Sequence, residues 1–320
     1  MTSVAVKRIT KDLRDLQKDP LESNGIYYFH DDIDFLRGRA LIVGPEDTPY
    51  RWGYYFFDFY YPEEYPYKPP KVVFQTREGT IRFNPNLYAC GKVCVSILNT
   101  WSGPQWTACQ SIRSVLLSLQ SLLNEHPLQN EPGFENDVSE RSQSYEHVIS
   151  HENARFAVLG MLKKQPPGFD IFQSILEKSY LQNLSKFLKW CLENKKIHPP
   201  KVIRTSLYGM KIVTYWDIII EKGLQHAIKL GATDDNFSSY LSAAKKRKKE
   251  DRADGKKKKK NKIIISKNPW SKLTMEEMNN KKTVALLKKH IIAKKITDNL
   301  QGFKKQQLCQ TIWDFYHPSE

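Results

Sequence analysis

The sequence predicts an α+β fold in its first half, followed by a mostly helical extension. Three observations lead to this prediction. Apolar side chains recur at helical spacing near the N-terminus, four short runs of β-branched and aromatic residues lie between 26 and 74, and helical spacing returns after residue 110. With 320 residues, the chain is long enough for about two domains.

The first expected element is an amphipathic helix at residues 4–18. Basic residues occupy much of its surface, and Asp19-Pro20 ends it because the residue before a proline is driven out of helical conformation. Its apolar stripe consists of Val6, Ile9, Leu13 and Leu16.

Four strands follow, expected at residues 25–29, 39–43, 53–60 and 71–74. The linkers between them are short, which favours an antiparallel meander, because parallel strands need long crossover connections. The stretch from 79 to 108 shows little regular structure.

Four further helices are expected at residues 110–124, 139–163, 171–194 and 207–230. Residues 245–262 are a charge run with no apolar face to bury, and residues 274–316 have the pattern of short helices. We divide the chain into a first domain at 1–162, called the catalytic domain because of the motifs described below, a helical extension at 163–244, a basic linker at 245–266 and a small helical C-terminal domain at 267–320.

The composition argues against several classes of protein. An odd number of cysteines at irregular spacing does not fit a disulfide framework, and no second Cys/His pair at ligand spacing follows Cys90 and Cys94, so we expect no metal site. The N-terminus lacks the apolar core of a secretory signal, and no apolar run approaches the roughly 18 residues that cross a bilayer. We expect an intracellular protein, in the cytoplasm, the nucleus or both, with no membrane partner.

The net charge of +15 is unevenly distributed. Residues 1–162 hold 16 Lys+Arg against 20 Asp+Glu, whereas residues 245–262 hold 12 against 3. Contact with nucleic acid, through neutralisation of phosphates, is therefore expected only from the C-terminal basic region. The two basic clusters of this region are also typical of a bipartite nuclear-localisation signal, although a flexible linker has the same composition.

Cys94 carries the strongest chemical signal in the chain. It follows Asn86 by eight residues, on a segment expected to be an exposed loop. A thiolate attacks well and leaves well, so a cysteine can accept an acyl group and pass it on. No obvious histidine base accompanies it, which suits acyl transfer through a thioester better than proteolysis.

Several motifs extend this prediction to a family. They are Gly44-Pro45-Glu46-Asp47-Thr48-Pro49-Tyr50, Tyr65-Pro66-Tyr67-Lys68-Pro69-Pro70-Lys71-Val72, and Gly91-Lys92-Val93-Cys94 with Ile97-Leu98. With these motifs, the chain from about residue 4 to 160 resembles a ubiquitin-conjugating enzyme. The resemblance implies the UBC fold of that family: an N-terminal helix, a four-stranded antiparallel meander, an active-site loop and C-terminal helices.

Two further segments resemble the large Z-type conjugating enzymes. They are Arg82-Phe83-Asn84-Pro85-Asn86 and Thr100-Trp101-Ser102-Gly103-Pro104-Gln105-Trp106. Asn84 stands where most of the family has a histidine, a position whose role is largely structural.

The resemblance implies roles for particular residues. Cys94 would carry the acyl group, and the Asn86 amide would donate to the oxyanion, with a capping role after Pro85 as the alternative. The acidic gate of the family maps to Asn130 or Glu131, where an ordinary loop turn is the alternative. Contacts with the activating enzyme or a ligase would come from Lys7, Arg8, Lys11, Arg14, Tyr67 and Trp106. The alternative for the four basic residues is an ordinary solvated helix face, and the alternative for the tryptophan is packing in the core.

The function implied is that of an acyltransferase. The chain would accept ubiquitin from an activating enzyme as a thioester and transfer it to a substrate lysine, usually with a ligase. It would use no cofactor, because the activating enzyme is the one that consumes ATP. Two alternatives remain open: an inactive scaffold that binds ubiquitin or nucleic acid, and a conjugating enzyme for another ubiquitin-like modifier.

Overall fold

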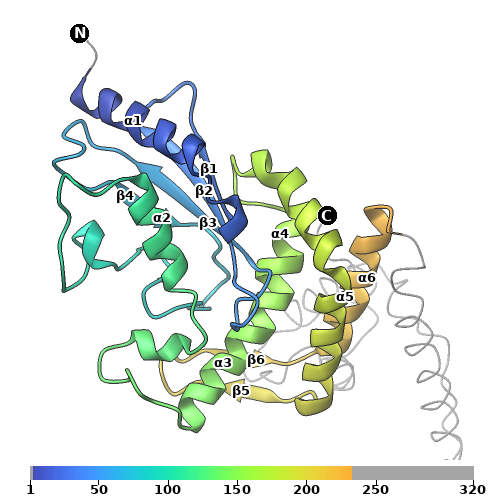
Figure 1. Ribbon diagram of the computed structural model, residues 1–320. Coiled ribbons are helices and arrows are strands. Elements are labelled where there is room, and N and C mark those ends of the chain that lie inside the picture. Colours follow the sequence, from blue (N-terminus) through green and yellow to red (C-terminus); the bar gives the residue numbers. More distant parts are fainter. Residues whose placement is uncertain (1–2, 233–320) are drawn as a thin grey trace, which may run out of the picture. The chain divides into compact units, whose positions relative to one another are not determined.

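The computed structural model describes residues 3–232 (Figure 1). The first helix, α1 (Val4–Lys18), begins at Ser3, whose side chain accepts a hydrogen bond from the Val6 N–H and so satisfies one of the free donors of the first turn. Its buried residues are Ala5, Ile9 and Asp12. The helix predicted at residues 4–18 is therefore confirmed.

A four-stranded antiparallel sheet follows α1, in the order β1-β2-β3-β4. Its strands are β1 (Ile26–His30), β2 (Arg37–Val43), β3 (Tyr54–Tyr60) and β4 (Lys71–Phe74). Each strand pairs with the next one along the chain, for example Ala40 with Phe57 and Phe59 with Val72. The predicted meander is confirmed, with ends that differ from prediction by one or two residues.

Both faces of this sheet are buried. Along β3, Tyr55, Phe57 and Phe59 enter one core, whereas Tyr54 and Phe56 enter a second core, because successive strand side chains point to opposite faces. The first core includes residues of α1, α2 (Ile112–Ser121) and α3 (Glu140–Glu152). The second core lies between the sheet and the later helices, so the sheet is the middle layer of the catalytic domain and the extension.

Short helical segments connect these layers. They are the 3-10 turns Glu22–Asn24, Ser96–Leu98, Pro127–Asn130 and Asp170–Phe172, the π-helical segment Asn153–Val158, and α4 (Leu159–Lys163). Within the π-helical segment, the buried Asn153 accepts a hydrogen bond from the Tyr55 hydroxyl at 2.6 Å. A Cβ at Gly53 would lie 1.9 Å from the Asn153 Oδ1 atom, so only glycine fits beside this side chain.

The extension packs on the sheet through two helices, α5 (Gln173–Ile197) and α6 (Trp216–Lys229). The Tyr54 hydroxyl donates to the main-chain carbonyl of Leu176 at 3.0 Å, and the Tyr180 hydroxyl donates to that of Gly223 at 2.7 Å. These bonds tie α5 to the sheet and to α6. The predicted boundary between residues 162 and 163 stays a prediction.

The helix predicted at residues 207–230 is wrong in its first part. Residues Val202–Arg204 and Lys211–Val213 form a two-stranded antiparallel sheet, β5 and β6, beside α3 (Figure 1), and α6 begins only at Trp216. The hairpin turn contains Gly209 at φ 59°, a conformation that interrupts a helix. The predicted helical extension is therefore interrupted by a hairpin.

The basic linker predicted at 245–266 and the helical domain predicted at 267–320 lie outside the described residues. Within residues 3–232, the helices are all too short or too polar to cross a membrane.

Candidate active site

Cys94 lies in the segment between β4 and the 3-10 turn Ser96–Leu98. The residue is 1% exposed, so the expectation of an exposed loop position is wrong for the thiol itself. Its neighbours Val93 and Val95 are buried as well, and the nearest exposed residues are Lys92 on one side and Asn99 and Thr100 on the other. This burial could not be deduced from residue spacing.

Asn86 and Cys94 face each other across this segment. The Cys94 N–H donates to the Asn86 main-chain carbonyl at 2.9 Å, and the Asn86 Nδ2 atom donates to the Cys94 main-chain carbonyl at 2.7 Å. Asn86 is buried, and its Oδ1 atom has no hydrogen-bond partner among the described residues. The sequence spacing thus identified two residues that are in direct contact, with the amide bonded to the backbone of the cysteine.

Asn84 holds the backbone of Asn86 in place and links it to the core. Its Nδ2 atom donates to the Tyr50 hydroxyl at 2.9 Å and to the Leu122 carbonyl at 2.7 Å, while its Oδ1 atom accepts from the Asn86 N–H at 2.9 Å. The side chain is fully buried, and every one of these bonds holds backbone or core groups in place. Asn84 therefore performs a structural role at the position where most of the family has a histidine.

Gly91 permits the tight approach of the cysteine segment to the sheet. Its φ of +93° is rarely adopted by residues with a side chain, and a Cβ there would lie 2.9 Å from the Phe74 carbonyl oxygen. The Phe74 N–H donates to the Gly91 carbonyl at 2.8 Å, which extends the edge of β4. The glycine three residues before Cys94 is thus required by backbone geometry.

The loop that follows Cys94 is held by its own hydrogen bonds. The Thr100 hydroxyl contacts the main-chain N–H and carbonyl of Val95 at 3.0 and 3.1 Å. Asn99, at φ 57°, accepts from the Trp106 N–H at 2.8 Å through its side chain. A pocket of about 520 Å³ opens beside this loop, lined mainly by residues 69–73 and 90–93, with Leu98 and Thr100.

The predicted gate residues lie at the end of the 3-10 segment Pro127–Asn130, where Asn130 is its last residue and Glu131 caps it. Asn130 donates to the Leu122 carbonyl at 3.0 Å and accepts from Asn124 at 2.8 Å, so its amide is engaged inside the fold. Glu131 instead accepts a 2.6 Å hydrogen bond from the Tyr208 hydroxyl. The two candidate residues therefore have different surroundings. Of the two, Glu131 is the one whose side chain contacts the extension, through Tyr208.

Two residues near the site had no role assigned from the sequence. The Arg82 guanidinium lies 3.7 Å from the ring centroid of Tyr88 and 4.1 Å from that of Tyr208, and the Arg82 N–H contacts the Met210 sulfur at 3.2 Å. Burial, and then the bond to Glu131, raise the pKa of the Tyr208 hydroxyl. Gly209 is a turn signal, but no pattern in the sequence connects position 208 with position 82.

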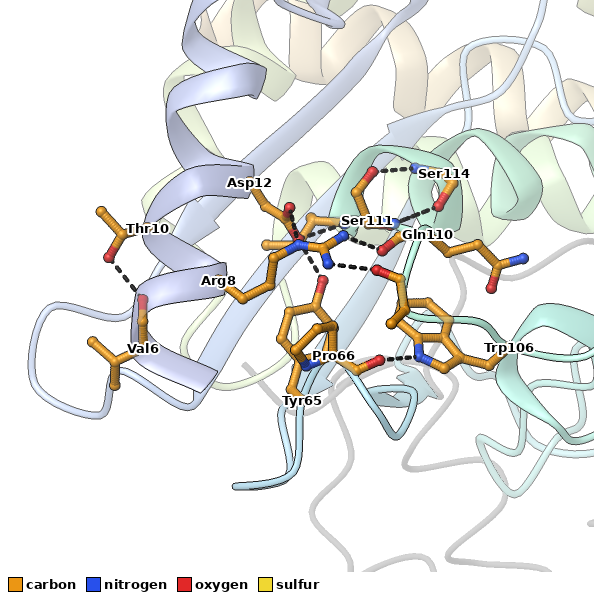
Figure 2. A network of polar contacts seen from close by, with 12 residues as sticks. Val6, Arg8, Thr10, Asp12, Tyr65, Pro66, Trp106, Gln110, Ser111 and Ser114 are labelled. Carbon is orange, nitrogen blue, oxygen red and sulfur yellow. Dashed lines mark hydrogen bonds and ion pairs between the residues drawn. The ribbon is translucent and has the colours of Figure 1, made fainter. Parts of the chain in front are cut away.

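Figure 2 shows how α1 is attached to the rest of the domain. The Arg8 guanidinium donates to the Asp12 carboxylate at 2.8 Å and to the main-chain carbonyls of Ala108 and Gln110. The buried Asp12 carboxylate also accepts from the Tyr65 hydroxyl and from the Ile112 N–H, at the start of α2. This network fixes α1 against the loop before α2.

The residues predicted to contact the activating enzyme or a ligase differ in exposure. Lys7, Lys11 and Arg14 are exposed on α1, and Tyr67 is 74% exposed on the proline-rich loop. Arg8 is held by the network above. Trp106 is 8% exposed, and its Nε1 atom donates to the Pro66 carbonyl at 2.6 Å (Figure 2).

No group of three or more His, Cys, Asp or Glu side chains suited to hold a metal ion occurs within residues 3–232. Of the cysteines described there, Cys90 and Cys109 are exposed and Cys94 and Cys191 are buried, all of them as free thiols.

Comparison with known proteins agrees with this geometry. Residues 8–154 match the family model described as ubiquitin-conjugating enzyme. The N-terminal helix, the meander and the cysteine-bearing loop therefore make up a UBC domain, the domain that this family model describes.

Within that family, the chain is similar to proteins called ubiquitin-conjugating enzyme E2 Z. It is 45% identical over 179 residues to the protein of Xenopus tropicalis, which covers 55% of this chain and 56% of the relative. It is 44% identical over 177 residues to the protein of Homo sapiens, covering 55% and 49%. A probable ubiquitin-conjugating enzyme protein 17 of Caenorhabditis elegans is 40% identical over 186 residues, covering 54% and 25%.

The chain thus spans about half the length of the E2 Z relatives that it matches. The predicted resemblance to the Z-type branch is confirmed by this similarity.

Proposed function

We propose that the chain accepts ubiquitin from an activating enzyme as a thioester on Cys94 and transfers it to a substrate lysine. The observation that carries the proposal is the pairing of Cys94 with Asn86 at the centre of a UBC domain, through two hydrogen bonds of 2.9 and 2.7 Å. The relatives named ubiquitin-conjugating enzyme E2 Z support the same activity.

The loading step is a thioester exchange. The Cys94 sulfur attacks the acyl carbon that the activating enzyme holds on its own cysteine; the bond from carbon to Cys94 forms, the bond to the first sulfur breaks, and the thiol proton of Cys94 leaves with that sulfur. Neither ATP nor a metal ion takes part in this exchange, so we propose that the chain itself needs no cofactor.

Transfer then forms an amide bond. The neutral amine of a substrate lysine attacks the carbonyl carbon, and the carbon–nitrogen bond forms. The bond to Cys94 then breaks, the sulfur leaves as a thiolate, and the proton lost by the amine passes to this sulfur and restores the thiol. The tetrahedral intermediate carries a negative oxygen. The Asn86 amide has two N–H donors, and the Cys94 carbonyl accepts from this group, so the second donor is available for that oxygen.

The burial of Cys94 adds a requirement to this proposal. A thiol that is 1% exposed is out of reach of a macromolecular donor, so the residues packed around it have to move for loading. We propose that the loop at residues 96–105, which follows Cys94 and is mostly exposed, is the part that moves. We expect the activating enzyme to bind the exposed basic residues Lys7, Lys11 and Arg14, and a ligase to contact Tyr67.

A charging assay tests the assignment of the nucleophile. Wild-type protein is incubated with activating enzyme, ATP and ubiquitin, and we expect an adduct that a thiol reductant removes. Cys94→Ala should abolish it, whereas Cys90→Ala should not. Cys90 is a matched control because it lies four residues away and is exposed, hence more accessible than Cys94.

An adduct on Cys94→Ala that persists and disappears with Cys90→Ala would contradict the assignment. Wild-type protein that stays uncharged with several activating enzymes would favour the inactive scaffold. Charging by another ubiquitin-like modifier in a parallel assay would change the proposed modifier and leave the proposed thioester mechanism as it is.

We further propose an intracellular location, with the basic segment at 245–262 directing the protein to the nucleus. The same segment supports weak, salt-sensitive contact with nucleic acid as a secondary property.

A further inference from the structure

The turn between β5 and β6 holds Tyr208 in an unusual backbone conformation. Its φ is 61°, in the left-handed region that residues with a side chain seldom occupy. Thr205 fixes the turn: its N–H donates to the Met210 carbonyl at 3.0 Å, and its hydroxyl accepts from the Met210 N–H at 3.1 Å. A strained residue that the surrounding structure holds in place is a reason to look for a function there.

The aromatic ring of Tyr208 contacts the segment that carries Asn86. The Arg82 guanidinium lies between the rings of Tyr208 and Tyr88, at 4.1 and 3.7 Å from their centroids. The Arg82 guanidinium also donates to the Pro85 carbonyl, and the Tyr145 hydroxyl donates to the Arg82 carbonyl at 2.6 Å. Tyr208 thus covers one face of an arginine that is bonded to the backbone next to Asn86.

The hydroxyl of the same tyrosine reaches a second loop. It donates to the Glu131 Oε2 atom at 2.6 Å, a charge-assisted bond to a side chain that is only partly exposed. One residue of the extension therefore contacts both the Asn84–Tyr88 segment, through Arg82, and the turn that holds the predicted gate. Loops placed by a shared contact keep a fixed separation, and acyl transfer depends on the relative placement of its groups.

We propose that Tyr208 is a positioning residue for the attack of lysine on the Cys94 thioester. Through Arg82 it fixes the segment bearing Asn86, and through its hydroxyl it fixes Glu131, the predicted gate residue that would face the incoming lysine. The inference rests on the proposed function. It assigns to the β5–β6 hairpin of the extension a part in the reaction of the catalytic domain.

The main test variant is Tyr208→Gly. Glycine adopts a φ of 61° without strain, so this change removes the side chain while leaving the turn in its preferred conformation. Tyr208→Phe keeps the ring on Arg82 and removes only the bond to Glu131. Lys211→Ala, on the exposed face of β6 in the same hairpin, is the matched control.

The measurement is single-turnover discharge of the purified ubiquitin thioester to free lysine. Its first-order rate constant describes charged molecules only, so a loss of folded protein lowers the amplitude of charging and leaves the rate constant unchanged. We expect Tyr208→Gly to lower the rate constant on the order of tenfold, because both the cation–π contact and a charge-assisted hydrogen bond are lost. Tyr208→Phe should lie between wild type and Tyr208→Gly, and Lys211→Ala should match wild type.

Rate constants of Tyr208→Gly and Tyr208→Phe within twofold of wild type would overturn the inference while leaving the proposed function standing. Wild-type protein that does not charge would instead contradict the proposed function. Equal slowing by Lys211→Ala would also overturn the inference, because it would show that the whole hairpin, and not Tyr208, governs the rate.

Discussion

At the scale of single residues, the side chain of Asn86 decides how the site can work. Its Nδ2 atom donates to the Cys94 carbonyl at 2.7 Å, so part of its role is to hold the loop. The amide group still has a second N–H donor, and a fixed donor beside an oxyanion is worth about 2.7–4 kcal/mol in a comparable site. Loop holding and oxyanion stabilisation therefore predict rate effects of different size.

We expect Asn86→Ala to slow the discharge of the Cys94 thioester to lysine by about 10²–10³-fold, as expected for the loss of an oxyanion donor. The matched control is Thr100→Val, which removes a hydroxyl that bonds both the N–H and the carbonyl of Val95 and so also holds this loop. The rate constant of single-turnover discharge and the unfolding curve are measured for both variants and compared.

A discharge rate of Asn86→Ala similar to that of Thr100→Val would show that the asparagine only shapes the loop. A larger effect of Asn86→Ala at similar stability supports its contact with the reacting oxygen.

At the scale of secondary-structure elements, α3 joins the catalytic domain to the extension. The ring of His147 on α3 lies 4.0 Å, between centroids, from that of His198 at the end of α5. His151 on α3 accepts from the Tyr215 N–H at 3.0 Å through its Nε2 atom, just before α6 begins. The Nδ1 atom of His151 therefore carries its proton when neutral and donates it to Glu152 at 2.8 Å.

This junction makes stability depend on pH. Burial, and then the charges of His198 and Lys201, lower the pKa of His147 from 6.5 to about 4. Between these values the unfolded chain binds a proton at this histidine that the folded chain does not, so the free energy of unfolding falls as the pH drops from 6.5 towards 4.

We therefore expect His147→Phe, which keeps an aromatic ring beside His198, to lose part of the decrease in unfolding free energy between pH 7 and pH 5. Urea unfolding at several pH values measures this decrease. His126→Phe is the control, because His126 is partly exposed and interacts with Glu146 at 3.0 Å instead of with the extension. Identical pH dependence in wild type and His147→Phe would contradict the prediction.

At the scale of the whole molecule, the sequence predicts some features well and others poorly. The helix at the N-terminus and the four strands follow from periodicity, and the contact of Asn86 with Cys94 follows from their spacing within a motif. The burial of Cys94 was not predicted, and the contact of Tyr208 with Arg82 joins residues far apart in the chain. Such features depend on tertiary packing, which local residue patterns do not encode.

The extension also determines how the sheet is covered. Leu41, Trp52, Tyr54 and Phe56 contribute to a core that they share with residues of α5 and α6, including Leu176 and Trp216. Burying one large apolar side chain contributes roughly 1.5–3 kcal/mol, so these four together contribute on the order of 6–12 kcal/mol. This amount is comparable to the whole stability of a typical domain, about 5–15 kcal/mol.

We therefore expect a chain that ends at residue 163 to lose cooperative unfolding and to aggregate or bind an apolar dye, because that face of its sheet is uncovered. A chain that ends at residue 243 keeps α5 and α6 and is the matched control, with the cooperative transition of the full chain expected. Size-exclusion chromatography and urea unfolding of the two truncated chains measure the difference. If the chain ending at residue 163 were monomeric and as stable as the longer one, the second core would not be part of what stabilises the catalytic domain.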